Sequence, residues 1–182
     1  MEFERCAIPD VILVRPRVVA DVRGHFFESW QARNFAAAGI DVRFVQDNEN
    51  LSKRHVLRGL HYQLERPQGK LVRVVTGTVF DVAVDLRRSS PTFGKWVGMV
   101  LSQENHHALW VPPGFAHGFL VMSESAHFLY KCTDFYAPED ERAIRWDDAQ
   151  LAIEWPLVAG ASPVLSKRDE AAVELHRAQC YP

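Results

Sequence analysis

The clearest structural signal lies in residues 71–86, which read Leu71-Val72-Arg73-Val74-Val75-Thr76-Gly77-Thr78-Val79-Phe80-Asp81-Val82-Ala83-Val84-Asp85-Leu86. The segments Leu71–Val75 and Val79–Leu86 are rich in β-branched residues, which pack well on a pleated sheet. Between them, Gly77 can adopt the positive φ that a tight turn needs. We therefore expect two strands joined as a β-hairpin.

Short apolar segments separated by turn residues continue this pattern along the chain. We expect further strands at Trp96–Leu101, Ala108–Val111, Phe119–Met122 and His127–Cys132. Two segments differ: Gln31–Ala38 predicts a short helix stopped by Gly39, and Lys167–Gln179 predicts a terminal helix with Ser166 as its N-cap. Many short strands with few helices indicate an all-β sandwich, barrel or jelly roll with short peripheral helices.

Composition excludes several classes of protein. With 182 residues, 47% of them hydrophobic, the chain fits one globular domain over residues 1–182. A formal net charge of −2 disfavours nucleic acid and anionic membranes as partners, and no segment reaches membrane-spanning length. Three widely spaced cysteines without metal-ligand spacing favour a reducing compartment, so we expect a cytoplasmic protein.

The segment Leu57–Gln63 holds the first candidate for chemistry. Alternation along a strand places Gly59 and His61 on one face, so the imidazole has open space beside it. The alternative is a histidine that only satisfies a hydrogen bond in the core. Arg58 is a candidate for phosphate binding, together with Arg23 and Arg73, because a guanidinium offers paired donors to an oxyanion. Strict alternation points Arg58 away from His61, and a bulge at Gly59 would reconcile the two.

Two further strands carry polar residues among apolar ones. Lys70 shares a face with Val72 and Val74, so it lies either at the rim of a cavity or at a solvated strand start. His117 has the parity of three apolar neighbours, which places it in the interior of the sandwich or barrel. Two interior histidines raise the question of a metal, but common sites need three or four ligands and no third is recognisable, so we expect none. The pair His106-His107 is expected in a solvated turn.

Two more groups have both a structural and a functional interpretation. Tyr130 is either a core tyrosine with a satisfied hydroxyl or a proton donor that lies across a cavity from His61. Asp169 lies three residues after Ser166, where a carboxylate stabilises the first helical turn. That role fully explains its presence. A carboxylate there could also reach His61 and orient its ring, a contact that no sequence argument over about a hundred residues establishes.

Taken in order, these motifs resemble the dTDP-4-dehydrorhamnose 3,5-epimerases, the RmlC-type members of the cupin superfamily. The resemblance runs from about Ile8 to Trp155 and more weakly to Asp169. It rests on Asp21-Val22-Arg23-Gly24 with Phe27-Glu28, Gln46-Asp47-Asn48, Arg58–Gln63, Gly69-Lys70-Leu71-Val72, Asp81-Val82-Ala83-Val84-Asp85, Ser89-Ser90-Pro91-Thr92-Phe93-Gly94, Pro113-Gly114-Phe115-Ala116-His117-Gly118-Phe119, Tyr130-Lys131 and Tyr136-Ala137-Pro138.

The resemblance implies a homodimeric cupin jelly roll that acts on dTDP-4-dehydro-6-deoxy-D-glucose, inverts C3 and C5 and uses no cofactor. By position, His61 is the general base, Tyr130 the acid, Lys70 the neighbour of the C4 carbonyl oxygen and Asp169 the partner of the histidine. The implied nucleotide-sugar contacts are Arg23, Glu28, Gln46, Asn48, Arg58, His117 and Glu141, with Tyr136 stacking on thymine. One departure is that the family commonly has Lys immediately before the aspartate, where this chain has Lys167-Arg168.

Three other functions keep most of these motifs. A relative that inverts only one carbon, or acts on another deoxysugar, differs in product alone. A metal-dependent cupin oxygenase or isomerase would use His61 and His117 with a third ligand. A non-catalytic module would bind thymidine nucleotides without exchanging substrate hydrogens. Metal analysis and hydrogen exchange into deuterated solvent distinguish these from the double epimerase.

Overall fold

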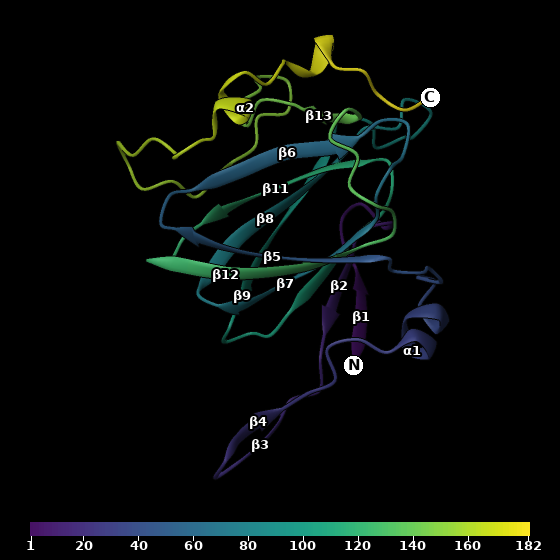
Figure 1. Cartoon of the computed structure of the whole chain (residues 1–182), viewed down its shortest axis with the longest axis vertical. Coiled ribbons are helices and arrows are strands. Elements are labelled where there is room, and N and C mark those ends of the chain that lie inside the picture. The colour runs from purple at the N-terminus through teal and green to yellow at the C-terminus, as the bar shows by residue number, and fades with distance from the viewer.

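Two antiparallel β-sheets packed face to face form the body of the protein in the computed structural model, which describes residues 1–182 (Figure 1). The six-stranded sheet has the order β1 (Glu2–Arg5), β2 (Ile12–Arg15), β10 (Ala108–Val111), β7 (Lys70–Thr76), β12 (Ser125–Cys132) and β5 (Gln46–Lys53). The five-stranded sheet has the order β13 (Glu141–Ala143), β6 (Leu57–Gln63), β11 (Phe115–Val121), β8 (Thr78–Asp85) and β9 (Trp96–Ser102). The predicted all-β jelly roll with short peripheral helices is confirmed.

The main hydrophobic core lies between the two sheets and follows the alternation of the strands. It contains sixteen buried residues, among them Val72 and Val74 of β7, Phe119 of β11 and Phe128 of β12. Phe119 and Phe128 stack with ring centroids 4.2 Å apart. Apolar residues therefore fill one part of the space between the sheets, and polar side chains on the same strand faces are left to line the rest.

The predicted hairpin at Gly77 is wrong, although both of its strands exist. Strand β7 pairs with β10 and β12, whereas β8 pairs with β11 and β9, so the turn carries the chain from one sheet to the other. Gly77 has φ of +82°, and a Cβ there would lie 2.1 Å from the Ser125 carbonyl oxygen. A tight turn indicates a change of direction, but the pairing partners depend on how both strands bury their inner faces.

The helices are short and peripheral. α1 (Ala32–Ala37) confirms the first predicted helix, and the side chain of Gln31 caps it by accepting a hydrogen bond from the Asn34 N–H. α2 (Lys167–Glu170) is only one turn long, so the predicted terminal helix to Gln179 is wrong beyond Glu170. Its cap is correct, because Ser166 Oγ accepts from the Asp169 N–H at 3.2 Å. No helix has the length and hydrophobicity needed to span a lipid bilayer.

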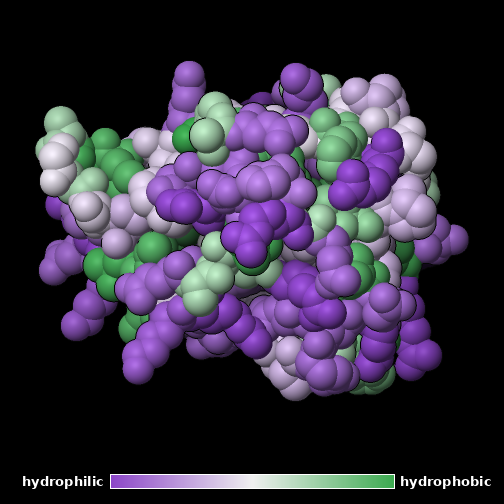
Figure 2. Space-filling model, turned by 90° about the horizontal axis from the view of Figure 1, so that it is seen from above, coloured by the Kyte–Doolittle hydropathy of each residue, from purple (hydrophilic) through white to green (hydrophobic).

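After α2 the path of the chain is set by contacts with residues far away in sequence and not by a continued helix. Val173 forms a parallel bridge with Ile144, next to β13, and the 3-10 helix η1 (Leu175–Arg177) buries Leu175. Tyr181 donates its hydroxyl to the Gln63 carbonyl oxygen at 2.6 Å. This C-terminal segment covers the outer face of the five-stranded sheet and supports β6 from behind (Figure 1). Viewed from above, over the C-terminal segment, the surface of the protein is mostly hydrophilic with small apolar patches (Figure 2).

A two-stranded hairpin, β3 (Val19–Asp21) and β4 (Gly24–Phe26), projects from the body at the end opposite α2 (Figure 1). We call residues 19–26 the arm. All residues of both strands are exposed, including Val19 and Phe26, and Val22 between them is fully exposed. The arm thus presents apolar side chains that nothing in this chain covers.

Candidate active site

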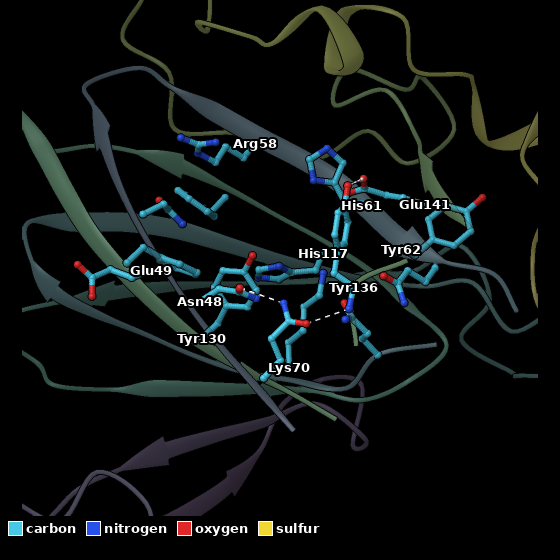
Figure 3. A pocket seen from close by; sticks show the side chains of 16 residues that line it. Asn48, Glu49, Arg58, His61, Tyr62, Lys70, His117, Tyr130, Tyr136 and Glu141 are labelled. Atoms are coloured by element: carbon cyan, nitrogen blue, oxygen red, sulfur yellow. Dashed lines mark hydrogen bonds between the residues drawn. The ribbon is translucent and has the colours of Figure 1, made fainter. Parts of the chain in front are cut away.

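A cavity of about 410 Å³ lies between the two sheets, opposite the apolar part of the core. Its walls come from β5, β7 and β12 on one side and from β6 and β11 on the other. Nine of the predicted site residues line it: Gln46, Asn48, Arg58, His61, Lys70, His117, Tyr130, Tyr136 and Glu141. Figure 3 shows Arg58 and His61 on one side of this cavity, with Lys70 and Tyr130 opposite them.

His61 is held from behind by a carboxylate. Asp169 Oδ1 lies 2.5 Å from His61 Nε2, and Asp169 is only 3% exposed. Ser166 donates its hydroxyl to the other carboxylate oxygen at 2.7 Å. Burial works to raise the pKa of Asp169, but the hydrogen bond and charge of His61, with Ser166, hold that pKa below its ordinary value. Because an ionised carboxylate accepts the Nε2–H, the lone pair of the neutral ring is on Nδ1.

A bulge explains how Arg58 and His61 reach the same cavity. His117 pairs with His61 while Phe119 pairs with Arg58, so β6 carries one extra residue at this point. Gly59 has φ of +120°, and a Cβ on it would lie 2.6 Å from Gly118 Cα. Glycine tolerates this positive φ and has no side chain to collide with Gly118. The bulge predicted at this position is confirmed.

Lys70 lines the cavity and is half-buried, which agrees with a position at the rim of a cavity and excludes a fully solvated strand start. Burial lowers the pKa of the Lys70 ammonium, and Cys132 and Asp81 act against that change. His117 is 7% exposed, and its Nε2 lies 3.0 Å from each oxygen of the fully buried Asp81. The two predicted interior histidines are therefore each joined to a carboxylate from another element.

Tyr130 lines the cavity from β12, on the same inward face as Phe128. Burial raises the pKa of the Tyr130 phenol, an effect that Cys132 reinforces and Arg58 opposes. The hydroxyl therefore keeps its proton at neutral pH and is available as a donor. Tyr130 thus lies at the cavity, as the proton-donor interpretation requires, and that role stays a prediction.

Polar side chains at every second position of β5 form one edge of the cavity. Gln46 Nε2 donates to Asn48 Oδ1 at 3.0 Å, and Gln46 Oε1 accepts from the Tyr136 N–H at 2.9 Å (Figure 3). Further along, Arg58 Nε donates to Ser52 Oγ at 3.0 Å. The edge strand thus orients both the amides and the guanidinium that face the cavity.

The mouth of the cavity contains a cluster that the sequence suggested only in part. The Tyr136 hydroxyl donates to Glu141 Oε2 at 2.8 Å, and the Tyr136 side chain is half-exposed. Arg168 forms an ion pair with the same Glu141 oxygen and donates to the Tyr136 hydroxyl at 3.4 Å. Arg168, the residue immediately before Asp169, thus faces the mouth of the cavity.

Two predicted substrate contacts lie away from the cavity of this chain. Arg23 is on the arm, where it pairs with Asp21 at 2.6 Å, and Glu28 follows the arm and accepts from Asn34. Their predicted role in substrate binding stays a prediction. Arg73, a third phosphate candidate, faces outward from β7 instead of into the cavity.

The prediction that His106-His107 lies in a solvated turn is wrong. Both side chains are half-buried, and the His106 ring packs on His25 and Phe27 with centroid distances of 4.6 and 4.9 Å. Contacts from a segment some eighty residues earlier cannot be inferred from turn residues alone. This small cluster lies outside the cavity that contains His61.

Comparison with known proteins gives a consistent result. A family model described as dTDP-4-dehydrorhamnose 3,5-epimerase matches residues 5–177. The enzyme of that name from Pseudomonas aeruginosa is 58% identical over 183 residues, covering 100% of both chains.

Two solved structures are also similar. The RmlC epimerase of Legionella pneumophila, solved with dTDP-4-keto-L-rhamnose, superposes with a TM-score of 0.94 at 51% identity, over 98% of this chain and 94% of the other. A 3'-monoepimerase from Streptomyces bikiniensis, solved with dTDP-quinovose, has a TM-score of 0.88 at 34% identity, over 94% of this chain and 86% of the other. This chain therefore belongs to the dTDP-4-dehydrorhamnose 3,5-epimerase family.

Proposed function

We propose that the protein converts dTDP-4-dehydro-6-deoxy-D-glucose to dTDP-4-dehydro-β-L-rhamnose by inverting C3 and C5, a step of dTDP-L-rhamnose biosynthesis. The observation that carries this proposal is the His61–Asp169 pair at a cavity whose opposite wall holds Lys70 and Tyr130. The 58% identity to the Pseudomonas aeruginosa enzyme over the full length supports the substrate assignment.

The chemistry follows from the acidity of hydrogens beside a ketone. His61 removes such a hydrogen, and the electron pair moves onto the C4 oxygen as an enolate. Lys70, as an ammonium, stabilises that negative charge, and Asp169 stabilises the imidazolium that forms. Tyr130 then protonates the carbon from the opposite face, which inverts it. Solvent takes the proton from His61 and returns one to Tyr130 before the second carbon reacts. Only protons are exchanged and the ketone activates both flanking carbons, so the reaction needs no redox cofactor.

The remaining cavity residues supply the contacts for the nucleotide. Arg58 binds the diphosphate, since its Nε is already fixed by Ser52 and its terminal nitrogens stay free. Tyr136, half-exposed at the mouth, stacks on thymine. Gln46, Asn48, His117 and Glu141 contact the sugar nucleotide. Holding the sugar between base and acid at fixed distance contributes much of the rate.

A homodimer accounts for the two predicted contacts that lie outside the cavity. We propose that the arm of one protomer lies against its partner and brings Arg23 and Glu28 to the partner's cavity. The exposed Val19, Val22 and Phe26 support this arrangement, because isolated hairpins with uncovered apolar side chains are marginally stable in water. We further propose a cytoplasmic location, supported by three cysteines held as free thiols.

Mixing two inactive variants tests the arm directly. Arg23→Ala removes the arm contact and His61→Ala removes the base, so each homodimer is inactive. If the arm acts on the partner, mixed dimers contain one site with both residues intact, and activity returns on mixing. Activity that stays absent after confirmed subunit exchange, or a monomer by sedimentation, rejects the shared site.

The main experiment follows hydrogen exchange. The 4-keto nucleotide sugar is incubated with enzyme in deuterium oxide, and NMR measures label at each carbon. We expect deuterium at both C3 and C5. Label at one carbon alone would favour a mono-epimerase, a second candidate that the similarity to the Streptomyces bikiniensis structure supports. Tight thymidine-nucleotide binding with no exchange would indicate a binding module, and activity that depends on a bound metal would indicate a metal-dependent cupin.

A further inference from the structure

Asp81 is a buried acid to which the proposed reaction assigns no task. It lies on β8, is 0% exposed and does not line the cavity, so it does not touch the substrate. Its two oxygens each lie 3.0 Å from His117 Nε2. A carboxylate is rarely buried without a partner, because removing the charge from water is costly. His117 is one partner, and the charge of Lys70 also acts on Asp81.

The surroundings of Lys70 show why a nearby negative charge matters. The titratable groups that line the same cavity as Lys70 or act on its charge are Glu49 of β5, Arg58, His61 and Tyr62 of β6, Asp81 of β8, His117 of β11, Tyr130 and Cys132 of β12, Tyr136, and Glu141 of β13. Burial lowers the pKa of Lys70, and only Cys132 and Asp81 act to raise it. Burial raises the pKa of the Cys132 thiol above an ordinary value that is already alkaline, so that group stays neutral. Burial also raises the pKa of Asp81, but the charge and hydrogen bond of His117 and the charge of Lys70 act to lower it, so Asp81 is the group of the two that supplies an anion.

We propose that Asp81 is a positioning residue for the epimerisation: its carboxylate keeps the Lys70 ammonium charged and fixes the ring of His117 without touching the substrate. This inference rests on the function proposed above. An enolate is stabilised by Lys70 only while the amine carries its proton, and that charge acts more strongly in a partly buried site than in bulk water. By accepting the Nε2–H, the carboxylate also leaves Nδ1 of a neutral His117 ring free for the substrate.

Asp81→Asn removes the charge and keeps the shape, and Asp85→Asn is its matched control. Both aspartates are fully buried on β8, but Asp85 binds Arg87, Ser90 and Thr92 at the far end of the strand. We expect Asp81→Asn to lower kcat about 10- to 100-fold, as second-layer substitutions do. The KM should change less than about twofold, since uniform substrate binding is retained. Asp85→Asn should lower the thermal midpoint without changing kcat.

The pH dependence separates this role from a structural one. Without Asp81 the pKa of Lys70 falls further, so the alkaline limb of the kcat profile moves to lower pH. It should not move in Asp85→Asn. In a Lys70→Ala background, Asp81→Asn should lower kcat by a smaller factor than in the wild type, because Lys70 is gone and only the role at His117 remains. The proposal is overturned if the kcat–pH profile of Asp81→Asn does not move. It is also overturned if Asp81→Asn lowers kcat by the same factor in Lys70→Ala as in the wild type.

A spectroscopic measurement decides the matter without activity. The NMR signal of the Lys70 side chain, identified by its absence in Lys70→Ala, is titrated in the wild-type protein and in Asp81→Asn. We expect the amine to be protonated across the active pH range of the wild type and to lose its proton at lower pH in the variant. If Asp81→Asn fails to fold, a wild-type Lys70 that is already neutral at the pH optimum still rejects the proposal. If the wild-type protein exchanges neither the C3 nor the C5 hydrogen, the proposed function is rejected. The titration of Lys70 then still tests the role of Asp81.

Discussion

His61 Nε2 and Asp169 Oδ1 lie 2.5 Å apart although 108 residues separate them in sequence. Strand β6 supplies the imidazole and the single turn of α2 supplies the carboxylate. Ser166 both caps that turn and donates to Asp169, so one serine fixes the backbone and the side chain of the partner. Asp169 therefore lies in the first turn of α2 and against the His61 ring at the same time, and its role in orienting the ring stays a prediction.

Asp169→Asn should lower kcat about 10²- to 10⁴-fold, because the ring loses the charge that stabilises its protonated form and holds its tautomer. Deuterium exchange at C3 and C5 measures the loss. Asp148→Asn is the control, since Asp148 is equally buried but binds backbone N–H groups outside the cavity. Equal losses in the two variants would mean that Asp169 has only a structural role.

The sequence predicts the strands well because β-branched residues and turn glycines act locally. Residues 108–111 coincide with the observed β10, and the β7 and β8 segments are within two residues of their observed ends. Pairing is different: the turn at Gly77 does not reveal that its two strands belong to opposite sheets. Similarly, residues 171–179 have helical propensity, but Val173 and Leu175 gain more by pairing and burial against residues 143–148.

Alternation and the bulge at Gly59 bring the residues of β5, β6, β7, β11 and β12 to the cavity as the motifs indicate. The sequence does not mark Asp81 or Ser52 as a site residue, because each contacts a cavity residue from behind and neither lines the cavity, although Asp81 begins one of the motifs of the resemblance. Parity offers one usable signal: Asp81 lies two residues from Val79 and from Ala83, which are both buried in the main core. An acid at such an inward position needs a buried partner.

Asp85 should make the free energy of unfolding depend on pH in the acid range. Burial acts to raise its pKa, but hydrogen bonds from Arg87, Ser90 and Thr92 outweigh burial and lower the pKa from 3.8 to about 2. A pKa depressed in the folded state stabilises the protein above the unfolded value, and this contribution disappears as pH falls through the folded value. The shift corresponds to about 2 kcal/mol.

Urea unfolding from pH 7 to pH 2 tests this dependence. Wild-type protein should lose about 2 kcal/mol more than Asp85→Asn as the pH falls below about 4, because only the wild type has this carboxylate to protonate. The variant should start from a lower free energy of unfolding at pH 7. Parallel pH profiles for the two proteins would show that Asp85 does not contribute.

Gly59→Ala should damage both stability and activity. The positive φ costs an L-residue about 1–2 kcal/mol, and the new methyl group would also collide with the backbone at Gly118. Relief of that collision moves Arg58 and His61 relative to β11. Gly160→Ala is the control, because Gly160 also has positive φ but no atom within 4 Å of the added Cβ. Chemical denaturation should show a larger loss for Gly59→Ala, and only that variant should lose exchange activity.

Ser52→Ala should weaken nucleotide binding while sparing the chemical step. Ser52 is 4% exposed, accepts from Arg58 Nε at 3.0 Å and donates to Asn50 Oδ1 at 3.1 Å, so it links the guanidinium to the edge strand. Without the hydroxyl, Arg58 keeps its charge but loses its fixed orientation toward the diphosphate. A neutral-to-charged hydrogen bond of this kind contributes about 1 kcal/mol or more, which corresponds to roughly a fivefold increase in KM.

Calorimetry with dTDP and steady-state kinetics separate the two effects of that substitution. The Kd for dTDP and the KM should rise together, and kcat should stay within about twofold, because the lost contact serves ground state and transition state alike. Ser123→Ala is the control, since that hydroxyl binds the backbone at Thr78 and Ser125 and should affect stability alone. A fall in kcat without weaker dTDP binding would place Ser52 with the reacting groups and contradict a role through Arg58.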